Sequence, residues 1–200
     1  MNFLAHAHLS PPIPAVLLGN MVADFVRGRA RLALPPEMQV GIALHRHIDA
    51  YTDTHPQVLH CAALLEPRWG RYSVVLVDIF FDYVLAKHWG EHSVVRLGDF
   101  IPGVYDVLWS HREMLPERAR LATGAMVWDD WLSSYARISG IRLALKRLTQ
   151  RLRHDIDLAP AVEDLEAHLP ALEQAFAVFF PQLKQSLRAE GIASSLYGMP

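Results

Sequence analysis

The sequence SVVLVDIFFDYVLAK, from Ser73 to Lys87, decides whether this chain is built from helices or from strands. Its start, SVVLV, is rich in β-branched residues and is typical of a strand. The apolar residues nevertheless continue at helical spacing up to Lys87, well beyond the ~4–8 residues of a buried strand. We therefore predict one buried helix from Arg71 to Trp89 that ends at Gly90, because glycine commonly follows the end of a helix.

The rest of the chain is also predicted to be helical, because no stretch shows convincing strand alternation. We expect helices over Ala15–Arg27, from Pro36 to His55, from Ser93 toward Met114, from Pro116 toward Arg137 and over Ile141–Arg153. A last helical region starts at Pro160, where Pro170 and Pro181 are each expected to start a new helix or bend the old one. Without a linker or a repeat, residues 1–200 are predicted to form one all-α domain, in which 140–155 is a basic amphipathic helix.

The composition excludes several classes of protein. With 52% hydrophobic and 20% charged residues, the 200-residue chain has enough apolar side chains to bury a core and is not expected to be disordered. A net charge of -2 gives no overall positive field for nucleic acid. The 11 histidines are unevenly placed, since 9 of them precede Glu113, and this indicates that the N-terminal half holds the chemistry.

The sequence also indicates in which cellular compartment the protein is expected. The one cysteine, Cys61, has no partner for an internal disulfide, so no oxidising environment is needed. The first nine residues lack the basic start of a secretory signal and include His6 and His8. No run approaches the ~18 apolar residues that cross a bilayer. We expect a cytoplasmic protein with neither a membrane nor a nucleic-acid partner.

The densest polar cluster is LHRHIDAYTD, from Leu44 to Asp53. On a helix His45, Asp49 and Asp53 form one stripe, because residues four apart share a face. An imidazole nitrogen and a carboxylate one turn apart are able to bind the same divalent ion. The alternative is a solvated helix face with ordinary side-chain pairs. His47 points elsewhere, about 200° around the helix from His45.

Two further groups of carboxylates also have spacings that suit a metal site or a polar site. Asp78 and Asp82 are four apart within the apolar helix, where a buried carboxylate needs a metal ion or an arginine as a partner; we favour the metal. Asn20, Asp24 and Arg27 form one polar stripe on an otherwise apolar helix and are expected to face a site. The alternative for that stripe is a simple pair between Asp24 and Arg27.

The remaining histidines are harder to assign from the sequence. His6 and His8 diverge on a helix, and histidines in apolar surroundings are more often hydrogen-bonded core residues than ligands. His88 is either a phosphate contact or acid, or a cation that the helix C-terminus favours. The adjacent pair His154-Asp155 lies in a basic segment and is not expected to belong to the site.

Familiar nucleotide, zinc-protease, redox, serine-hydrolase and di-iron motifs are absent from the sequence. The pattern is typical of Mn²⁺, Mg²⁺ or a similar ion that activates water against phosphorus.

Four long blocks carry most of the polar residues above: NFLAHAHL (Asn2 to Leu9), GNMVADFVRG (Gly19 to Gly28), LHRHID (Leu44 to Asp49) with Thr52 and Asp53, and DIFFDYVLAKHW (Asp78 to Trp89). Together they resemble one known family, the acyl carrier protein phosphodiesterases. The blocks occur in the family's order and cover the first 90 residues. The last 110 residues are similar more loosely, through Trp128, Trp131 and the stretch from Phe176 to Pro181.

The resemblance implies a fold, a reaction and a cofactor. The family is similar to a divergent branch of the all-helical histidine–aspartate (HD) metal-dependent phosphohydrolases. Its members hydrolyse the phosphodiester that joins 4′-phosphopantetheine to a serine of holo-acyl carrier protein, with Mn²⁺ preferred, which implies a place in fatty acid biosynthesis and lipid metabolism. Position 47 is commonly arginine in the family and is histidine here, and the motif helix lacks the adjacent His-Asp pair of the HD superfamily.

The resemblance and the residue patterns together define the expected site. We expect the metal ligands to be Asp24, His45, Asp49, Asp78 and Asp82. Catalytic roles are expected for Asp24, His6 and His88, and substrate binding for Arg27, Arg46 and Asp53. Acyl carrier proteins are acidic, so a basic docking surface is expected, formed by Arg27, Arg29 and Arg31 or by the basic helix over 140–155.

Two other functions remain open at the level of sequence. One is a metal phosphohydrolase that acts on a nucleotide or another small phosphoester. The other is a non-enzymatic helical module that binds an acidic partner through its arginine-rich helix, with the His/Asp cluster as a structural metal site or a salt-bridge core. The number of metal ions and the oligomeric state do not follow from the sequence.

Overall fold

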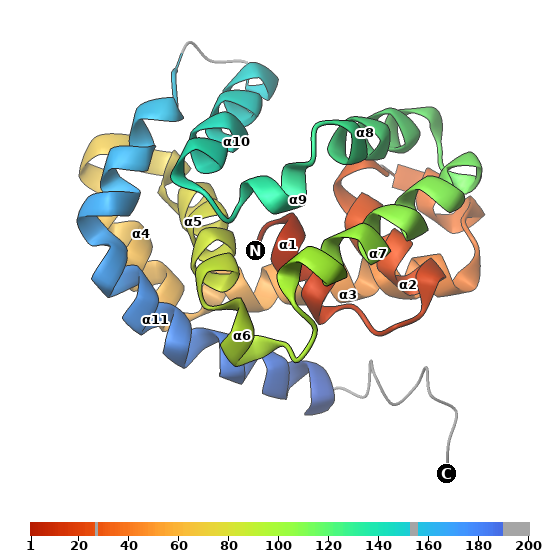
Figure 1. Cartoon of the computed structure of the whole chain (residues 1–200), viewed down its shortest axis with the longest axis horizontal. Helices are drawn as coiled ribbons and strands as arrows, with labels where there is room; N and C mark the ends of the chain where they lie inside the picture. Colours follow the sequence, from red (N-terminus) through yellow and green to blue (C-terminus); the bar gives the residue numbers. More distant parts are fainter. Residues whose placement is uncertain (27, 153–155, 190–200) are drawn as a thin grey trace.

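The chain folds into helices, and no strand occurs in residues 1–26, 28–152 and 156–189, which this computed structural model describes (Figure 1). The α-helices are α1 (Phe3–Leu9), α2 (Pro14–Val22), α3 (Pro36–Thr54), α4 (Pro56–Trp69), α5 (Ser73–Lys87), α6 (Trp89–His92), α7 (Leu97–Ser110), α8 (Glu117–Trp128), α9 (Trp131–Ser134), α10 (Ile138–Arg151) and α11 (Val162–Ala189). Short 3₁₀ helices are η1 (Ala23–Phe25), η2 (Gly28–Ala33), η3 (Gly70–Tyr72), η4 (Arg112–Met114) and η5 (Ala159–Ala161). The predicted all-α class is confirmed.

The stretch SVVLVDIFFDYVLAK forms α5, as predicted, and α5 is buried on most sides. It packs against α1, α4, α10 and α11, so valines that favour strands elsewhere are covered here by helices. The predicted end at Gly90 is wrong. The helix ends at Lys87, where the backbone of His88 leaves the helical region at φ -105° and ψ 23°, and Gly90 lies inside α6.

The last helix, α11, is longer than expected and runs continuously through Pro170 and Pro181. Neither proline starts a new helix; Figure 1 shows α11 curving along the outside of α4 and past α6. A proline within a helix bends it because it lacks the amide hydrogen and crowds the preceding turn. The second of the two predicted alternatives, a bent helix, is therefore the observed one.

Three other predicted helices have different ends. The first predicted helix changes to 3₁₀ after Val22, so Asp24 lies in η1, and residue 27 is outside the described part of the chain. Ser93 does not cap α7, which starts at Leu97; its hydroxyl instead accepts a hydrogen bond from the amide of Val95. The helix predicted from Pro116 toward Arg137 is split into α8 and α9 by Asp130, whose φ is 47°.

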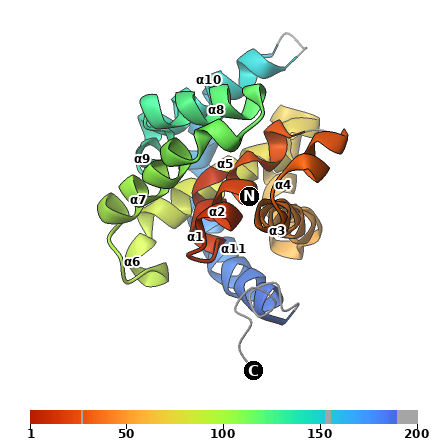
Figure 2. The same cartoon turned by 90° about the vertical axis from the view of Figure 1, so that its right-hand side faces the viewer.

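The helices α2 and α3 approach each other closely at two glycines. A Cβ at Gly19 would lie 2.1 Å from the carbonyl oxygen of Met38, and a Cβ at Gly41 would lie 2.1 Å from that of Val16. Figure 2 looks nearly along α3 and shows α1 and α2 beside it, while α1 also contacts α5. The buried apolar side chains form one cluster from α1 to α11. None of the described helices is long and apolar enough to cross a membrane.

Candidate active site

His45 on α3 has one ring nitrogen fixed by the backbone. Its Nδ1 lies 2.9 Å from the carbonyl oxygen of Asn20, so Nδ1 carries a proton and donates it. The other nitrogen, Nε2, is buried and makes no hydrogen bond of acceptable geometry, and no other buried side-chain nitrogen or oxygen of the described residues shares this condition. Nε2 lies 3.0 Å from Oδ2 of Asp49 and 3.4 Å from Oδ1 of Asp24.

His6 on α1 is held in the same way by the side chain of Asn20. The Asn20 amide nitrogen donates to the carbonyl oxygen of His6 and to the hydroxyl of Ser10, both at 2.9 Å, which leaves its Oδ1 to accept from Nδ1 of His6 at 2.9 Å. Nε2 of His6 then faces two acceptors at 3.1 Å, Oδ1 of Asp49 and the carbonyl oxygen of Met1. The rings of His6 and His45 stack with centroids 4.0 Å apart.

Three acceptor groups therefore converge on one position. The ligand atoms of His6, His45 and Asp49 all lie within 4.8 Å of one another. With both Nδ1 atoms protonated, the two Nε2 atoms present lone pairs to the Asp49 carboxylate. A positive charge between them would stabilise the group, in addition to the α-amino group of Met1, which lies 3.6 Å from Oδ1 of Asp49. A proton or a divalent ion would supply that charge, and two imidazoles with a carboxylate suit manganese, iron or zinc. Hydrogen bonds from the far ring nitrogens are typical of metal-binding histidines.

The pKa values of these three groups reflect the same electrostatics. Burial favours the neutral form of His45, but the carboxylates of Asp24 and Asp49 outweigh it and raise its pKa from 6.5 to about 9. Burial lowers the pKa of His6 to about 4 against the opposing effect of Asp49. Burial also raises the pKa of Asp49, yet its contacts with the two histidines dominate and hold it well below the usual range. The group is therefore built to attract a cation.

A cavity of about 250 Å³ adjoins this cluster, and four carboxylates line it. They belong to Asp24 on η1, Asp49 and Asp53 on α3, and Asp78 on α5. Burial raises the pKa of Asp78, and its Oδ1 accepts a hydrogen bond from the α-amino group of Met1 at 2.9 Å. The structure thus brings four of the predicted site residues to one cavity, from three separate elements.

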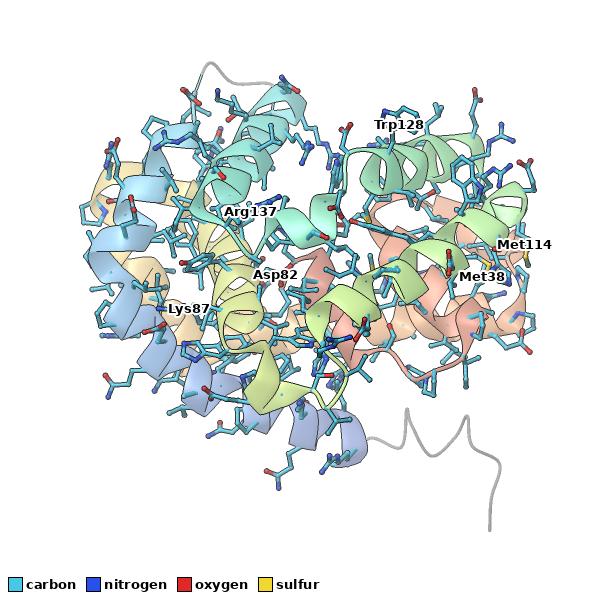
Figure 3. All side chains as sticks on the ribbon, in the orientation of Figure 1. Met38, Asp82, Lys87, Met114, Trp128 and Arg137 are labelled. Atoms are coloured by element: carbon cyan, nitrogen blue, oxygen red, sulfur yellow. The ribbon has the colours of Figure 1, made fainter. Side chains whose placement is uncertain are left out.

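Asp82 has a different position from the one expected of a metal ligand. Its Oδ2 accepts from the amide of Leu4 at 2.7 Å and its Oδ1 from the amide of Ala5 at 3.2 Å. Figure 3 shows Asp82 on α5 in the middle of the molecule, beside α1. Because both oxygens are used, Asp82 caps the free amides at the start of α1 and so holds His6 in place. Burial raises the pKa of Asp82 to about 7.

The structure does not bring His88 and Arg46 to the cavity. His88 follows the end of α5, about 15 Å along the helix from Asp78, and its ring nitrogens contact Glu91 at 3.0 Å and Glu173 at 2.8 Å. Arg46 is exposed and lines a different depression with Arg31. Both residues lie near the motifs in sequence, but the sequence does not show which face of each helix turns inward. Arg27 and the pair His154-Asp155 lie outside the described residues.

Sequence reasoning missed a second group of residues that line the cavity. They are Trp131 on α9, Tyr135 after it, and Arg147 and Arg151 on α10. From the sequence, the basic helix is predicted only as a docking surface for a protein. The spacing of four between the two arginines was the signal that places them on one face of α10.

Fold and site together define an all-helical protein with a histidine–aspartate group that fits a cation at the edge of an acidic cavity. The chain belongs to the acyl carrier protein phosphodiesterase family, whose model matches residues 1–183. This membership confirms the resemblance on which the expected reaction rests.

Curated relatives match nearly the whole chain. It is 33% identical over 194 residues to the acyl carrier protein phosphodiesterase of Yersinia pestis, covering 96% of this chain and 100% of that protein. It is 31% identical over 191 residues to the acyl carrier protein phosphodiesterase of Pectobacterium atrosepticum, covering 95% and 99%. No solved structure matches significantly, so the HD-like character of the fold stays a prediction.

Proposed function

We propose that this protein hydrolyses the phosphodiester between 4′-phosphopantetheine and a serine of holo-acyl carrier protein, which releases the apo protein. The observation that carries the proposal is the convergence of His6, His45 and Asp49 on one cation position beside an acidic cavity, in a member of this family. The substrate places the reaction in lipid metabolism and fatty acid biosynthesis. The buried, unpaired thiol of Cys61 is compatible with the cytoplasm, where we place the reaction.

The proposed cofactor is Mn²⁺, held by Nε2 of His6, Nε2 of His45 and a carboxylate oxygen of Asp49. Support comes from the unpartnered Nε2 of His45 and from the two acceptors that face Nε2 of His6. A divalent ion bound there polarises a phosphoryl oxygen and makes a bound water more acidic. Asp24, whose Oδ1 lies 3.4 Å from Nε2 of His45, and Asp78, which lines the same cavity, are able to hold water there.

Asp24 is the residue best placed to move a proton. Its side chain is 66% exposed toward solvent and the cavity, and its Oδ1 lies 3.4 Å from Nε2 of His45. The contact with His45 lowers the pKa of Asp24, which keeps it a carboxylate at neutral pH. A carboxylate in this position is able to accept a proton from a water that attacks phosphorus.

The protein substrate requires a surface as well as a cavity. Exposed cations on the outer side of α10, Arg142 and Lys146, and Arg29 on η2 provide positive charge on elements that border the cavity or its neighbouring depressions. We propose that an acidic carrier protein docks there, with electrostatic attraction that weakens as salt increases.

The test is incubation of the purified protein with holo-acyl carrier protein and Mn²⁺, followed by intact-mass measurement. We expect loss of the phosphopantetheine arm with wild type, no loss after chelation, and no loss with Asp24→Ala, whose circular dichroism should match wild type. Retained activity in Asp24→Ala would remove that residue from the mechanism. Faster turnover of nucleotides than of holo-acyl carrier protein would overturn the assigned substrate.

A further inference from the structure

The cavity beside the histidine–aspartate group is lined by groups of opposite charge. Asp24, Asp49 and Asp78 line it, and so do Arg147 and Arg151 of α10. The two arginines are four residues apart and therefore share one face of the helix. The cavity therefore offers a cation site and two guanidinium groups. An anionic group of a ligand would be able to bind the cation and the guanidinium groups at the same time.

Trp131 holds the two guanidinium groups. The Cζ atom of Arg147 lies 4.9 Å from the Trp131 ring centroid, and that of Arg151 lies 5.2 Å from it. Arg151 also lies 5.9 Å from the ring of Phe25. Such stacking restrains the planar groups while leaving their N–H donors free for other partners.

The position of Trp131 is itself set by a strained turn. Asp130, the residue before it, has a φ of 47°, and no other non-glycine among the described residues has a positive φ. The hydroxyl of Tyr105 donates to Oδ1 of Asp130 at 2.9 Å and accepts from the amide of Leu132 at 2.8 Å. Left-handed backbone in a non-glycine residue costs free energy and occurs where surrounding contacts maintain it, often at binding sites.

The arginines have few carboxylate partners of their own. The Arg147 side chain is only 17% exposed, and its one ion pair is a long contact of 3.4 Å with Asp129. Arg151 has no ion pair within the described part of the chain, and burial lowers its pKa. Arg147 is largely covered and only weakly paired, and Arg151 is exposed, so the positive charge of both guanidinium groups is available to an anion in the cavity.

We propose that Arg147 and Arg151 form a phosphate-binding subsite that holds the non-bridging oxygens of a phosphate ester, with Trp131 as the platform beneath them. This inference rests on the proposed function and deepens it, since it places the phosphorus between the arginine pair and the His6–His45–Asp49 group. Guanidinium forks match phosphate oxygens, and they stabilise the charge that gathers there in the transition state. The subsite replaces Arg46 in the expected set of substrate-binding residues.

The experiment compares Arg147→Gln, Arg151→Gln and the double variant with wild type. Inorganic phosphate is the probe for binding, measured by calorimetry in the presence of Mn²⁺, and holo-acyl carrier protein is the substrate for kcat and KM. We expect each single variant to weaken phosphate binding and kcat/KM by about 10- to 100-fold, the effect of losing one charge-assisted hydrogen bond. Mn²⁺ affinity should stay within threefold of wild type and serves as the measure of an intact site.

Two matched arginines separate the subsite from general charge effects. Arg188→Gln removes an exposed arginine at the end of α11 and should change neither phosphate binding nor turnover. Arg142→Gln should raise KM for the carrier protein without changing phosphate affinity. If Arg147→Gln fails to fold, Arg147→Lys decides the role of that position, since it keeps the charge and loses the fork.

The outcomes distinguish this inference from the proposed function. Phosphate affinity and kcat/KM at wild-type values in the double variant, with Mn²⁺ still bound, would overturn the subsite even if the enzyme cleaves holo-acyl carrier protein. If wild type binds phosphate but does not cleave holo-acyl carrier protein, and the double variant loses the phosphate binding, the subsite is supported and the assigned substrate is overturned.

Discussion

His6 and His8 lie two residues apart on the same short helix, α1, yet they occupy opposite kinds of environment. The His6 ring is surrounded by polar groups, with Asn20 on one nitrogen and Asp49 on the other. The His8 ring packs on Trp89, Phe100 and Phe180, with centroids 5.0, 6.3 and 5.8 Å away. Burial lowers the pKa of both rings to about 4.

The charges around the two rings differ more than the rings themselves. Asp49 contacts both His6 and His45 and Asp24 contacts His45, although His45 and the α-amino group of Met1 disfavour protonated His6. Near His8 the charged or titratable groups are Lys184 and His92, which both disfavour its protonated form. One side of α1 therefore attracts a cation and the other repels one. A low histidine pKa does not by itself mark a site; the neighbouring acceptors do.

Removal of one histidine from each environment should have very unequal effects. His45→Ala should reduce Mn²⁺ binding and turnover by at least about 100-fold, because a direct ligand contributes more than the ~10–100-fold of an outer partner. His8→Ala should leave both within a few-fold of wild type. Calorimetry with Mn²⁺ and the mass assay measure the two effects, and equal losses in both variants would refute the distinction.

The close approach of α2 and α3 is expected to support only the His45 side. Gly41→Ala places a methyl group 2.1 Å from the carbonyl oxygen of Val16, and separating the helices would pull His45 from Asn20. We expect a loss of about 3 kcal/mol in the free energy of unfolding, at the upper end for overpacking, together with weaker Mn²⁺ binding.

Gly124→Ala is the matched control for this substitution. Gly124 lies within α8, and a methyl group there would have no neighbour within 4 Å. It should raise the free energy of unfolding by about 0.5–1 kcal/mol through helix propensity. Urea denaturation measures both variants, and an unchanged midpoint for Gly41→Ala would show that the helices separate at no cost.

A substitution of Asn20 tests whether its side chain orients His6 toward the proposed metal position. Asn20→Ala removes the acceptor of Nδ1 of His6 while the backbone partner of His45 remains. We expect Mn²⁺ affinity to fall by about tenfold, at the lower end for outer partners of metal ligands. Gln182→Ala is the control, because Gln182 contacts Nε2 of His55 at 2.9 Å, just after the end of α3, and neither residue lines the cavity. Equal Mn²⁺ affinities in the two variants would contradict the role of Asn20.

The apolar surroundings of His8 should make the free energy of unfolding depend on pH. The folded pKa of His8 is about 4 against 6.5 in the unfolded chain, so the unfolded state binds the extra proton in this range. The stabilisation is complete above pH 6.5 and is lost as the pH falls toward 4. Between pH 6.5 and 5.5 wild type should lose about 1 kcal/mol more than His8→Phe, which keeps a ring and cannot titrate.

Urea denaturation of wild type and His8→Phe at several pH values measures this difference. The contributions of His6 and His92 are present in both proteins and cancel in the comparison. Parallel pH profiles for the two proteins would show that the protonated ring of His8 is tolerated among Trp89, Phe100 and Phe180.

Local patterns predicted much of the fold and part of the site. The buried helix from Ser73, the helix opened by Pro36, and the pairing of His45 with Asp49 follow from spacing alone, because a helix repeat fixes which residues share a face. The helix ends were less predictable. Gly90 did not stop a helix and Pro181 did not start one, because tertiary packing outweighs these preferences.

The helical class and the shared face of His45 and Asp49 follow from the order of residues alone. The placing of His6 beside them, the capping of α1 by Asp82, and the position of Arg147 and Arg151 on the same cavity arise only from tertiary packing. A helix repeat relates residues within one turn or two, whereas these roles depend on which face of each helix packs inward, and the whole buried core determines that packing.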